Sequence, residues 1–211
     1  MLLGKDLDRD LLRNLIDVYQ PQYLIVPGNM EVEFNNYILV SKINNFVVLY
    51  TKFPQYAVNE ELSFLLTTSG STGSPKLVRH SYKNVYFSYK QVAEFFGFTA
   101  NDIGLADLPI NYTMGLSVIC SHLYAGSEVV LTDYNLINKE FWKIFNTKGI
   151  TDITGVPFSY EVLDKLGFFL KDYPTLKILA EGGGRMNDVL FQKVALYCEP
   201  VSYTHLRAHE T

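Results

Sequence analysis

Residues 67–76 combine the side chains with the clearest chemical potential in the chain. The segment reads Thr-Thr-Ser-Gly-Ser-Thr-Gly-Ser-Pro-Lys. Its glycines allow successive N–H groups to point inward at positive φ, its hydroxyls add donors, and Lys76 adds a full positive charge. Oxygen-rich anions need many converging donors and little steric bulk around them. The segment therefore predicts a loop that binds phosphate groups, and it suits a triphosphate.

The spacing within this loop excludes two familiar phosphate-binding patterns. A Walker loop needs four residues between its first glycine and a Gly-Lys-Ser/Thr sequence, whereas Gly70 and Gly73 are three apart and Lys76 follows Pro75. The dinucleotide fingerprint GxGxxG is also absent from the loop. A third interpretation, in which Gly70 and Gly73 only form turns, does not account for the high density of Ser and Thr hydroxyl groups.

The elements that must position this loop alternate between strands and helices. Helical spacing and end signals predict helices over 8–19, 80–96, 115–124, 138–147, 159–166 and 187–196. Short apolar or β-branched runs predict strands over 23–26, 37–40, 46–50, 63–68, 104–108, 128–132, 150–154 and 176–180. This alternation indicates βαβ units, so we expect an α/β protein with mostly parallel sheets flanked by helices.

Composition narrows the class of protein. A chain of 211 residues with 48% hydrophobic and 19% charged residues is typical of a globular protein with a substantial core. The net charge of −4 argues against a nucleic-acid platform, and the apolar runs are too short for a membrane span. Charged residues near the N-terminus argue against a signal peptide, so we expect a cytoplasmic setting in which Cys120 and Cys198 are free thiols.

Residues 68–76 closely resemble the signature loop of the acyl-adenylate-forming superfamily, which is written Thr-Ser-Gly-Ser/Thr-Thr-Gly-x-Pro-Lys. This superfamily includes acyl- and aryl-CoA synthetases, adenylation domains of nonribosomal peptide synthesis, and luciferases. The resemblance implies that residues 1–200 are part of a large N-terminal AMP-binding domain. One departure is Leu77, because the family usually has glycine after the signature lysine.

Further landmarks resemble the family in the same order along the chain. His80 and Asn84 are similar to its His-x-x-x-Asn, and residues 108–115 resemble its Pro-Leu-Phe-His-x-x-Gly segment, with Tyr112 in place of the histidine. Residues 125–127 and 154–157 resemble its next two turns. Residues 181–186, Glu-Gly-Gly-Gly-Arg-Met, resemble the glycine turn that lines its adenine and acyl pocket.

The resemblance implies an ATP-dependent carboxylate ligase. In this family a carboxylate attacks the α-phosphorus of ATP to give acyl-AMP and pyrophosphate, and a CoA or carrier-protein thiol then accepts the acyl group. It implies that Lys76 and Thr72 act in catalysis, that Mg²⁺ assists, and that Tyr112 lines the substrate pocket. The residues implied to bind the nucleotide are Thr68, Ser69, Gly70, Ser71, Thr72, Gly73, Lys76, Gly182, Gly183 and Gly184.

Several family landmarks are missing, which bears on activity. The Tyr-Gly-x-Thr-Glu motif, the ribose-binding aspartate and the C-terminal catalytic lysine are absent, and residues 201–211 resemble the translation of a sequencing adapter. We therefore expect a non-native tail at 201–211, in which His205 and His209 are not metal ligands, and an inactive fragment of a longer ligase. Two alternatives remain: a nucleotide-binding module without turnover, and an unrelated phosphate-loop kinase or hydrolase. His80 is interpreted as a residue that caps or packs at a helix start, and His122 as a core or surface histidine. The aromatic run from Tyr82 to Phe96 is interpreted as helix packing and not as a stacking platform.

Overall fold

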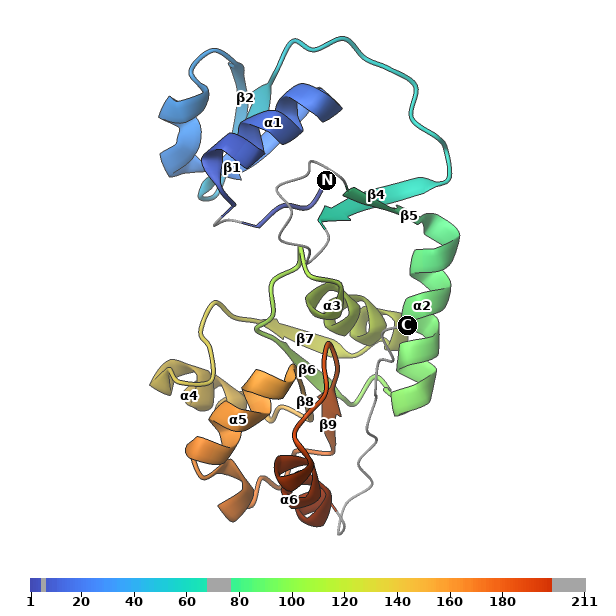
Figure 1. Ribbon diagram of the computed structural model, residues 1–211, viewed down its shortest axis with the longest axis vertical. Coiled ribbons are helices and arrows are strands. Elements are labelled where there is room, and N and C mark those ends of the chain that lie inside the picture. The colour runs from blue at the N-terminus through green and yellow to red at the C-terminus, as the bar shows by residue number, and fades with distance from the viewer. Residues whose placement is uncertain (5–6, 68–76, 199–211) are drawn as a thin grey trace.

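The computed structural model describes residues 1–4, 7–67 and 77–198, and its elements form two lobes joined by a two-stranded sheet (Figure 1). One lobe holds a three-stranded sheet and the first helix. The other lobe holds a four-stranded sheet and five further helices. The predicted signature-loop residues 68–76 and the predicted tail 201–211 lie outside the described residues.

The first lobe is an antiparallel sheet covered by a helix. Its elements are α1 (Arg9–Tyr19), β1 (Tyr23–Pro27), the 3-10 helix η1 (Gly28–Phe34), β2 (Ile38–Ile43) and β3 (Phe46–Tyr50), with strand order β1-β3-β2. The side chain of Asp8 caps α1 by accepting hydrogen bonds from the N–H groups of Asp10 and Leu11. The strands predicted over 37–40 and 46–50 form an antiparallel hairpin, and Asn44 occupies its turn with φ of 53°.

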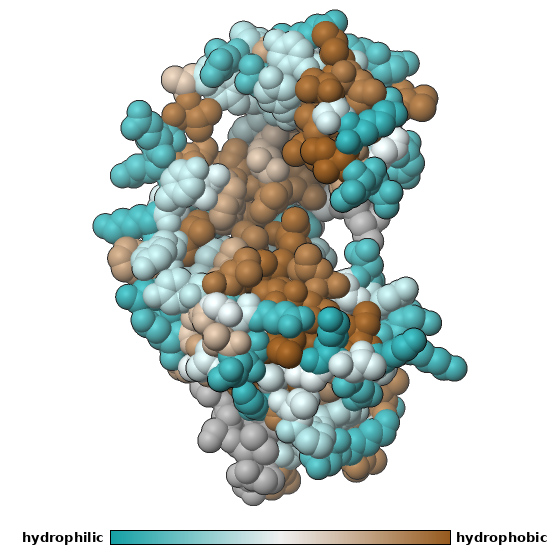
Figure 2. Space-filling view, turned by 180° about the vertical axis from the view of Figure 1, so that it is seen from behind, coloured by the Kyte–Doolittle hydropathy of each residue, from teal (hydrophilic) through white to brown (hydrophobic). Residues whose placement is uncertain are grey.

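One face of β1 and β3 is buried, whereas every residue of β2 is exposed. Val26, Val47 and Leu49 pack with Ile16 of α1 into a small core. The exposed large apolar side chains of the same strands are Tyr23, Ile25, Ile38, Leu39, Val40, Ile43 and Phe46. The space-filling view from behind shows apolar residues gathered over the upper and central part of the molecule (Figure 2).

The two lobes are joined by a pair of strands that the sequence predicted only in part. β4 (Leu62–Thr67) matches the predicted strand, and it pairs antiparallel with β5 (Leu77–Ser81), which was not predicted. His80 therefore lies in a strand, and the prediction that it opens the following helix is wrong. The N-cap is Ser81, whose side chain accepts from the N–H of Asn84. His80 stacks on Phe64 instead, with ring centroids 4.9 Å apart.

The second lobe has the α/β architecture that the alternation predicted. Its elements are α2 (Tyr82–Phe96), β6 (Ile103–Ala106), α3 (Thr113–Ala125), β7 (Glu128–Leu131), α4 (Lys139–Lys148), β8 (Asp152–Gly155), α5 (Pro157–Lys165), η2 (Phe168–Leu170), β9 (Ile178–Glu181) and α6 (Asp188–Cys198). The four strands are parallel in the order β7-β6-β8-β9. Parallel strands require crossover connections, and the intervening helices provide them.

Helices cover both faces of the parallel sheet (Figure 1). The larger core joins Leu105, Ile153 and Leu179 of the strands to the buried aromatic rings of α4, α5 and η2. The ring of α3 residue His122 lies against Gly104 of β6, which is the register partner of Asp152 in β8. Because side chains alternate along a strand, Gly104 and Asp152 belong to the face that α3 covers.

The aromatic residues of α2 are more exposed than the sequence predicted. The run from Tyr82 to Phe96 was interpreted as helix packing, but Tyr82, Tyr86 and Phe95 are each more than half exposed in the structure. Ala93 is the buried residue of this helix. Within the described residues, no helix combines the length and apolar character needed to cross a membrane.

Candidate functional site

Three loops meet where the parallel strands β6, β8 and β9 end. Residues 107–112 follow β6, residues 156–157 follow β8, and residues 182–187 follow β9. The carboxyl ends of parallel strands are the usual ligand-binding edge of an open α/β sheet. These loops contain three of the landmarks that the sequence singled out, so the fold brings together segments more than 70 residues apart.

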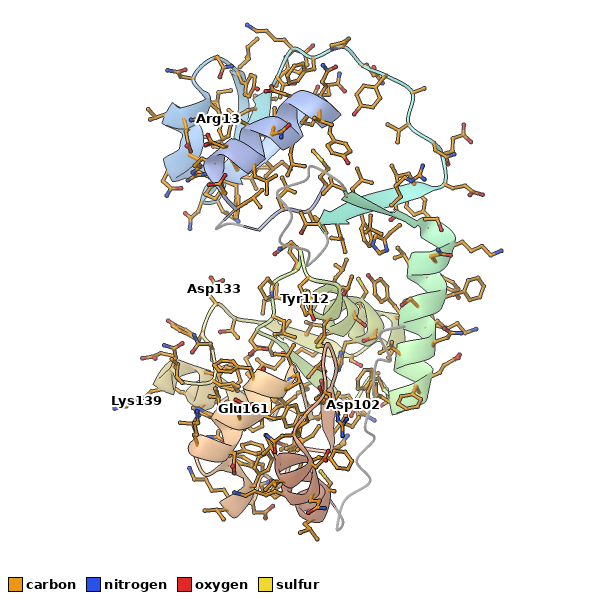
Figure 3. All side chains as sticks on the ribbon, in the orientation of Figure 1. Arg13, Asp102, Tyr112, Asp133, Lys139 and Glu161 are labelled. Carbon is orange, nitrogen blue, oxygen red and sulfur yellow. The ribbon has the colours of Figure 1, made fainter. Side chains whose placement is uncertain are left out.

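The glycine turn after β9 is closely surrounded by the other two loops. A Cβ atom added to Gly183 would lie 2.6 Å from Oη of Tyr112 and 3.4 Å from a methyl of Val156. One added to Gly182 would lie 2.7 Å from the terminal methyl of Met114, and one on Gly184 would lie 3.2 Å from the ring of Pro157. The structure therefore places Tyr112 beside the predicted Gly182, Gly183 and Gly184, and Figure 3 labels Tyr112 immediately before α3.

Gly183 also has a backbone conformation that favours glycine, with φ of +80°. We predict that Gly183→Ala lowers the free energy of unfolding by about 2 kcal/mol, because a Cβ adds strain at positive φ and contacts Tyr112 too closely. Gly97→Ala is the matched control, since Gly97 has φ of +67° and nothing within 4 Å of the added Cβ. Urea denaturation of both variants separates the two costs, and equal losses would contradict the close contact with Tyr112.

Hydrogen bonds fix the turn against the neighbouring strand. The N–H of Gly182 donates to the carbonyl of Gly155 at 3.1 Å, which continues the pairing of β8 with β9. The hydroxyl of Tyr160, which is buried in α5, donates to the carbonyl of Ala180 at 2.8 Å. These contacts hold the end of β9 in place from two elements, so the turn is presented on a rigid base.

A small cavity opens behind the turn, between the sheet and helices α2 and α3. Its volume is about 60 Å³. Gly182 lines it, and the apolar part of its wall comes from Val92, Phe96, Phe98, Met114, Val118 and Ala180. Gly182 belongs to the turn and lines the cavity, and Met114 of α3 lines the cavity and lies against Gly182, so the two features are continuous.

A buried pair of a histidine and an aspartate lies beside this cavity, and the histidine, His122, lines it. Nε2 of His122 lies 2.9 Å from Oδ2 of Asp152, and both side chains have no solvent exposure. Nδ1 of His122 lies 2.8 Å from the carbonyl oxygen of Val118. Because a carbonyl can only accept, Nδ1 carries a proton, and a second proton is shared between Nε2 and the carboxyl group. The pair therefore holds one more proton than a neutral histidine beside a carboxylate.

The pKa values of the pair follow from this arrangement. Burial raises the pKa of Asp152 despite the opposing hydrogen bond from His122. Burial alone would lower the pKa of His122, but the hydrogen bond and charge of Asp152 outweigh burial, and the pKa is raised. Asp102 faces the same pair and favours protonation of both groups, while Lys177 forms an ion pair with Asp102 at 2.7 Å.

This pair predicts a loss of stability as pH rises. The unfolded histidine has a pKa of about 6.5, so above that pH the folded state binds the shared proton and the unfolded state does not. The free energy of unfolding is expected to fall as the pH rises above about 6.5, the ordinary pKa of histidine, and to fall more steeply than in Asp152→Asn. Denaturant unfolding of both proteins at several pH values gives the difference between their free energies of unfolding. The contributions of the other titrating groups cancel in that difference. Parallel curves for the two proteins would contradict the shared proton.

A second carboxyl group with a raised pKa lies at the edge of the site. Asp107 follows the last residue of β6, and burial raises its pKa to about 6. Both Asp107 and the His122–Asp152 pair were missed from the sequence. The available signal was a titratable residue inside an otherwise apolar element, at His122 in α3 and at Asp152 at the start of β8.

Other predicted features can be placed only in part. The predicted nucleotide-binding residues Thr68, Ser69, Gly70, Ser71, Thr72, Gly73 and Lys76 lie outside the described residues. The described strands that flank them, β4 and β5, pair Thr67 with Leu77. Among the described residues, no group of three His, Cys, Asp or Glu could hold a metal ion, so no residue is assigned to Mg²⁺. Cys120 and Cys198 are free, as predicted.

The parallel sheet and the loops that converge at its carboxyl edge are typical of α/β proteins that bind a ligand at that edge. The family model described as AMP-binding enzyme matches residues 19–203. The chain therefore belongs to the AMP-binding family, which is the acyl-adenylate-forming superfamily that the loop resembled.

Curated relatives and solved structures agree with this assignment. A 2-succinylbenzoate–CoA ligase of Staphylococcus aureus (strain MSSA476) is 27% identical over 180 residues, which is 84% of this chain and 35% of the relative. The Bacillus subtilis o-succinylbenzoate CoA synthetase in complex with its acyl-adenylate intermediate is 28% identical, with a TM-score of 0.57 over 67% of this chain and 29% of that chain. The chain thus spans about a third of the relatives it matches.

Two structures of lower identity support the fold alone. A variant of E. coli MenE has a TM-score of 0.67 at 18% identity, covering 98% of this chain and 43% of that chain. The N-terminal domain of FACL13 from Mycobacterium tuberculosis has a TM-score of 0.61 at 18% identity, covering 77% and 40%. The predicted α/β fold of an adenylate-forming N-terminal domain is confirmed.

Proposed function

We propose that this chain is part of an ATP-dependent carboxylate ligase that forms an acyl-AMP intermediate. The observation that carries the proposal is the convergence of Tyr112, Val156 and the 182–184 turn at the carboxyl edge of the parallel sheet. This edge is where the superfamily resemblance expects the nucleotide and the acid to meet. The signature loop between β4 and β5 supports the same interpretation through its sequence.

The reaction joins the acid to the nucleotide. A carboxylate oxygen forms a bond to the α-phosphorus of ATP, the bond from that phosphorus to the bridging oxygen breaks, and pyrophosphate leaves with the electron pair. A thiol of CoA or of a carrier protein then attacks the acyl carbon, and AMP leaves. The carboxylate is a weak nucleophile, so catalysis depends on positioning the two reactants and on stabilising phosphate charge.

Each part of the chain has a proposed role in this reaction. The N–H groups and hydroxyls of 68–73 bind the β- and γ-phosphates, and Lys76 adds charge beside the same oxygens. The glycine turn, against which Tyr112, Met114 and Pro157 pack closely, is proposed to border the adenylate. Tyr112 borders the acid where it meets this turn. Mg²⁺ would neutralise phosphate charge, with ligands outside the described residues.

The proposal separates the parent enzyme from the chain itself. The chain spans 35% of the first ligase relative, and one motif and two catalytic or binding residues that the resemblance implies are not found in its sequence. We propose that the fragment alone does not form acyl-AMP. The alternative is a module that binds nucleotide without turnover. The two hypotheses differ in one outcome: a full-length ligase releases pyrophosphate from ATP, and a binding module does not.

The test is ATP–pyrophosphate exchange by the full-length protein with a panel of carboxylic acids. Exchange that depends on one class of acid supports the ligase, and the fragment under the same conditions should show none. A full-length protein that binds ATP but exchanges no pyrophosphate with any acid would favour the binding module. Exchange by the purified fragment would overturn the proposal that it is inactive.

A further inference from the structure

The residue that follows the signature loop is hydrogen-bonded to a side chain of the first lobe. The N–H of Leu77, the first residue of β5, donates to Oη of Tyr19 at 3.1 Å. Tyr19 is the last residue of α1, and both residues are half-buried. Because the nitrogen of Leu77 is bonded to the carbonyl carbon of Lys76, this hydrogen bond fixes the position of the chain directly after the loop.

The pairing of β4 with β5 explains why this N–H is open to a partner outside the sheet. In an antiparallel pair, facing residues alternate between those that exchange two backbone hydrogen bonds and those that exchange none. The carbonyl of Leu65 accepts from the N–H of Leu2, on the side of β4 away from β5, so Leu65 exchanges none with its facing residue. Thr67 is two residues further along, so its pair with Leu77 also exchanges none. The N–H of Leu77 therefore points away from β4, and the hydroxyl of Tyr19 supplies its acceptor.

Tyr19 itself is held firmly by the first lobe. Ile16, one turn earlier in α1, is buried in the small core. The carbonyl of Tyr19 accepts from the hydroxyl of Tyr56. The hydroxyl of Thr51, directly after β3, donates to the carbonyl of Pro21 at 2.6 Å and so fixes the chain that follows α1. The hydroxyl of Tyr19 is thus a positioned acceptor, held by elements that contain none of the predicted nucleotide-binding residues.

We propose that Tyr19 is a positioning residue for the nucleotide-binding loop, and this inference rests on the function proposed above. Its hydroxyl holds the backbone at Leu77, next to Lys76, which is proposed to place charge beside the phosphate oxygens. At the other end of the loop, Thr67 is held by the pairing of β4. A loop whose two ends are fixed before ATP arrives loses less conformational freedom on binding, so it binds ATP more tightly. The first lobe thereby strengthens ATP binding through a contact that does not involve the nucleotide.

The first test compares Tyr19→Phe with the wild type in the full-length protein, by calorimetric titration with ATP and Mg²⁺. Phenylalanine removes only the hydroxyl, so the Kd for ATP should rise by about fivefold, which corresponds to the net contribution of one hydrogen bond. The number of binding sites should stay the same. A variant that is only less stable would instead show fewer sites at the wild-type Kd, so the titration separates the two causes.

Tyr197→Phe is the matched control, because it also removes one tyrosine hydroxyl that is hydrogen-bonded to the backbone. Oη of Tyr197 donates to the carbonyl of Lys171 at 3.1 Å, at the α6 end of the second lobe and away from β5 (Figure 1). Its Kd for ATP should equal that of the wild type. Equal Kd values for Tyr19→Phe and the wild type would overturn the positioning role and leave the ligase intact. A wild-type protein that does not bind ATP would reject the nucleotide-binding loop, and the role of Tyr19 with it.

The second test is the split between KM and kcat in pyrophosphate exchange, with the acid that gives the fastest exchange in the panel above. In Tyr19→Phe the KM for ATP should rise by about fivefold. The KM for the acid should be unchanged, because the acid is proposed to bind at the glycine turn. A fall in kcat with both KM values unchanged would indicate a loss of folded enzyme and would contradict the positioning role. If the wild type binds ATP without exchange, the ligase is rejected and the calorimetric comparison still decides the role of Tyr19.

A third measurement follows the hydrogen bond directly. Hydrogen exchange of peptides that contain Leu77, measured by mass spectrometry without nucleotide, should be faster in Tyr19→Phe than in the wild type. It should be unchanged in Tyr197→Phe. Equal exchange in all three proteins would show that the hydroxyl of Tyr19 does not protect this N–H, and the proposal would then be wrong.

Discussion

Truncation of Asp152 to alanine is expected to lower the free energy of unfolding by about 3–5 kcal/mol. Asp152 is fully buried, and its Oδ2 is the partner of His122. Removing the carboxylate leaves Nε2 of His122 without its partner in a buried region. It also creates a space against β6, because the aspartate fills the α3-facing side of β8. Chemical denaturation at pH 6, where the shared proton is present, measures the loss.

A double-mutant cycle separates the pair from the packing around it. His122→Leu alone removes the histidine partner of the buried carboxylate and should lower the free energy of unfolding by a similar amount. The double variant His122→Leu/Asp152→Leu should recover much of that lost stability. Buried ion pairs that are replaced together by apolar groups are often neutral in their effect on stability. Additive losses in the cycle would show that the two side chains do not act as a unit.

Replacement of Lys76 and Thr72 by alanine in the full-length protein should reduce pyrophosphate exchange by at least about 10²-fold. Loss of one preorganised donor to developing charge costs about 3 kcal/mol in enzymes that act by such electrostatics. Both residues belong to the signature loop, and both are proposed to contact the transferred phosphates. The loss should appear in kcat, since these contacts strengthen as charge builds on the phosphate oxygens.

The control for this experiment is Lys143→Ala, which removes an exposed lysine of α4 and changes the net charge by the same amount. Its exchange rate should match the wild-type rate. A double variant of Thr72 and Lys76 that exchanges pyrophosphate at the wild-type rate would remove the loop from the reaction. Thermal unfolding of all three proteins must agree for the comparison to report on catalysis.

Much of the second lobe could be predicted because its local signals agree with its tertiary structure. The chain reads as strand and helix in alternation, and glycines end α2, α3 and α4 in the left-handed conformation at Gly97, Gly126 and Gly149. The side chain of Asn187, the first residue of the helix predicted over 187–196, accepts from the N–H of Leu190, as an N-cap residue does. Each of these signals lies within a short stretch of sequence, so it can be recognised without knowledge of the fold.

The features that could not be predicted depend on distant partners. The sequence of β5, Leu-Val-Arg-His-Ser, has no clear strand period, and it becomes a strand because β4 pairs with it. The exposure of Tyr86 on α2 depends on which neighbours cover that helix. His122 and Asp152 are 30 residues apart in sequence, and only the packing of α3 on β8 brings them together.

The ring of His122 has one further neighbour with consequences for how this protein can diverge. A Cβ on Gly104 would lie 2.7 Å from two atoms of that ring, so any larger residue at 104 displaces the buried histidine. The residues at positions 104 and 122 are therefore expected to change together in evolution. Homologous chains that carry alanine or a larger residue at 104 are expected to have given up the histidine at 122, and an alignment of close relatives should show the two positions changing together.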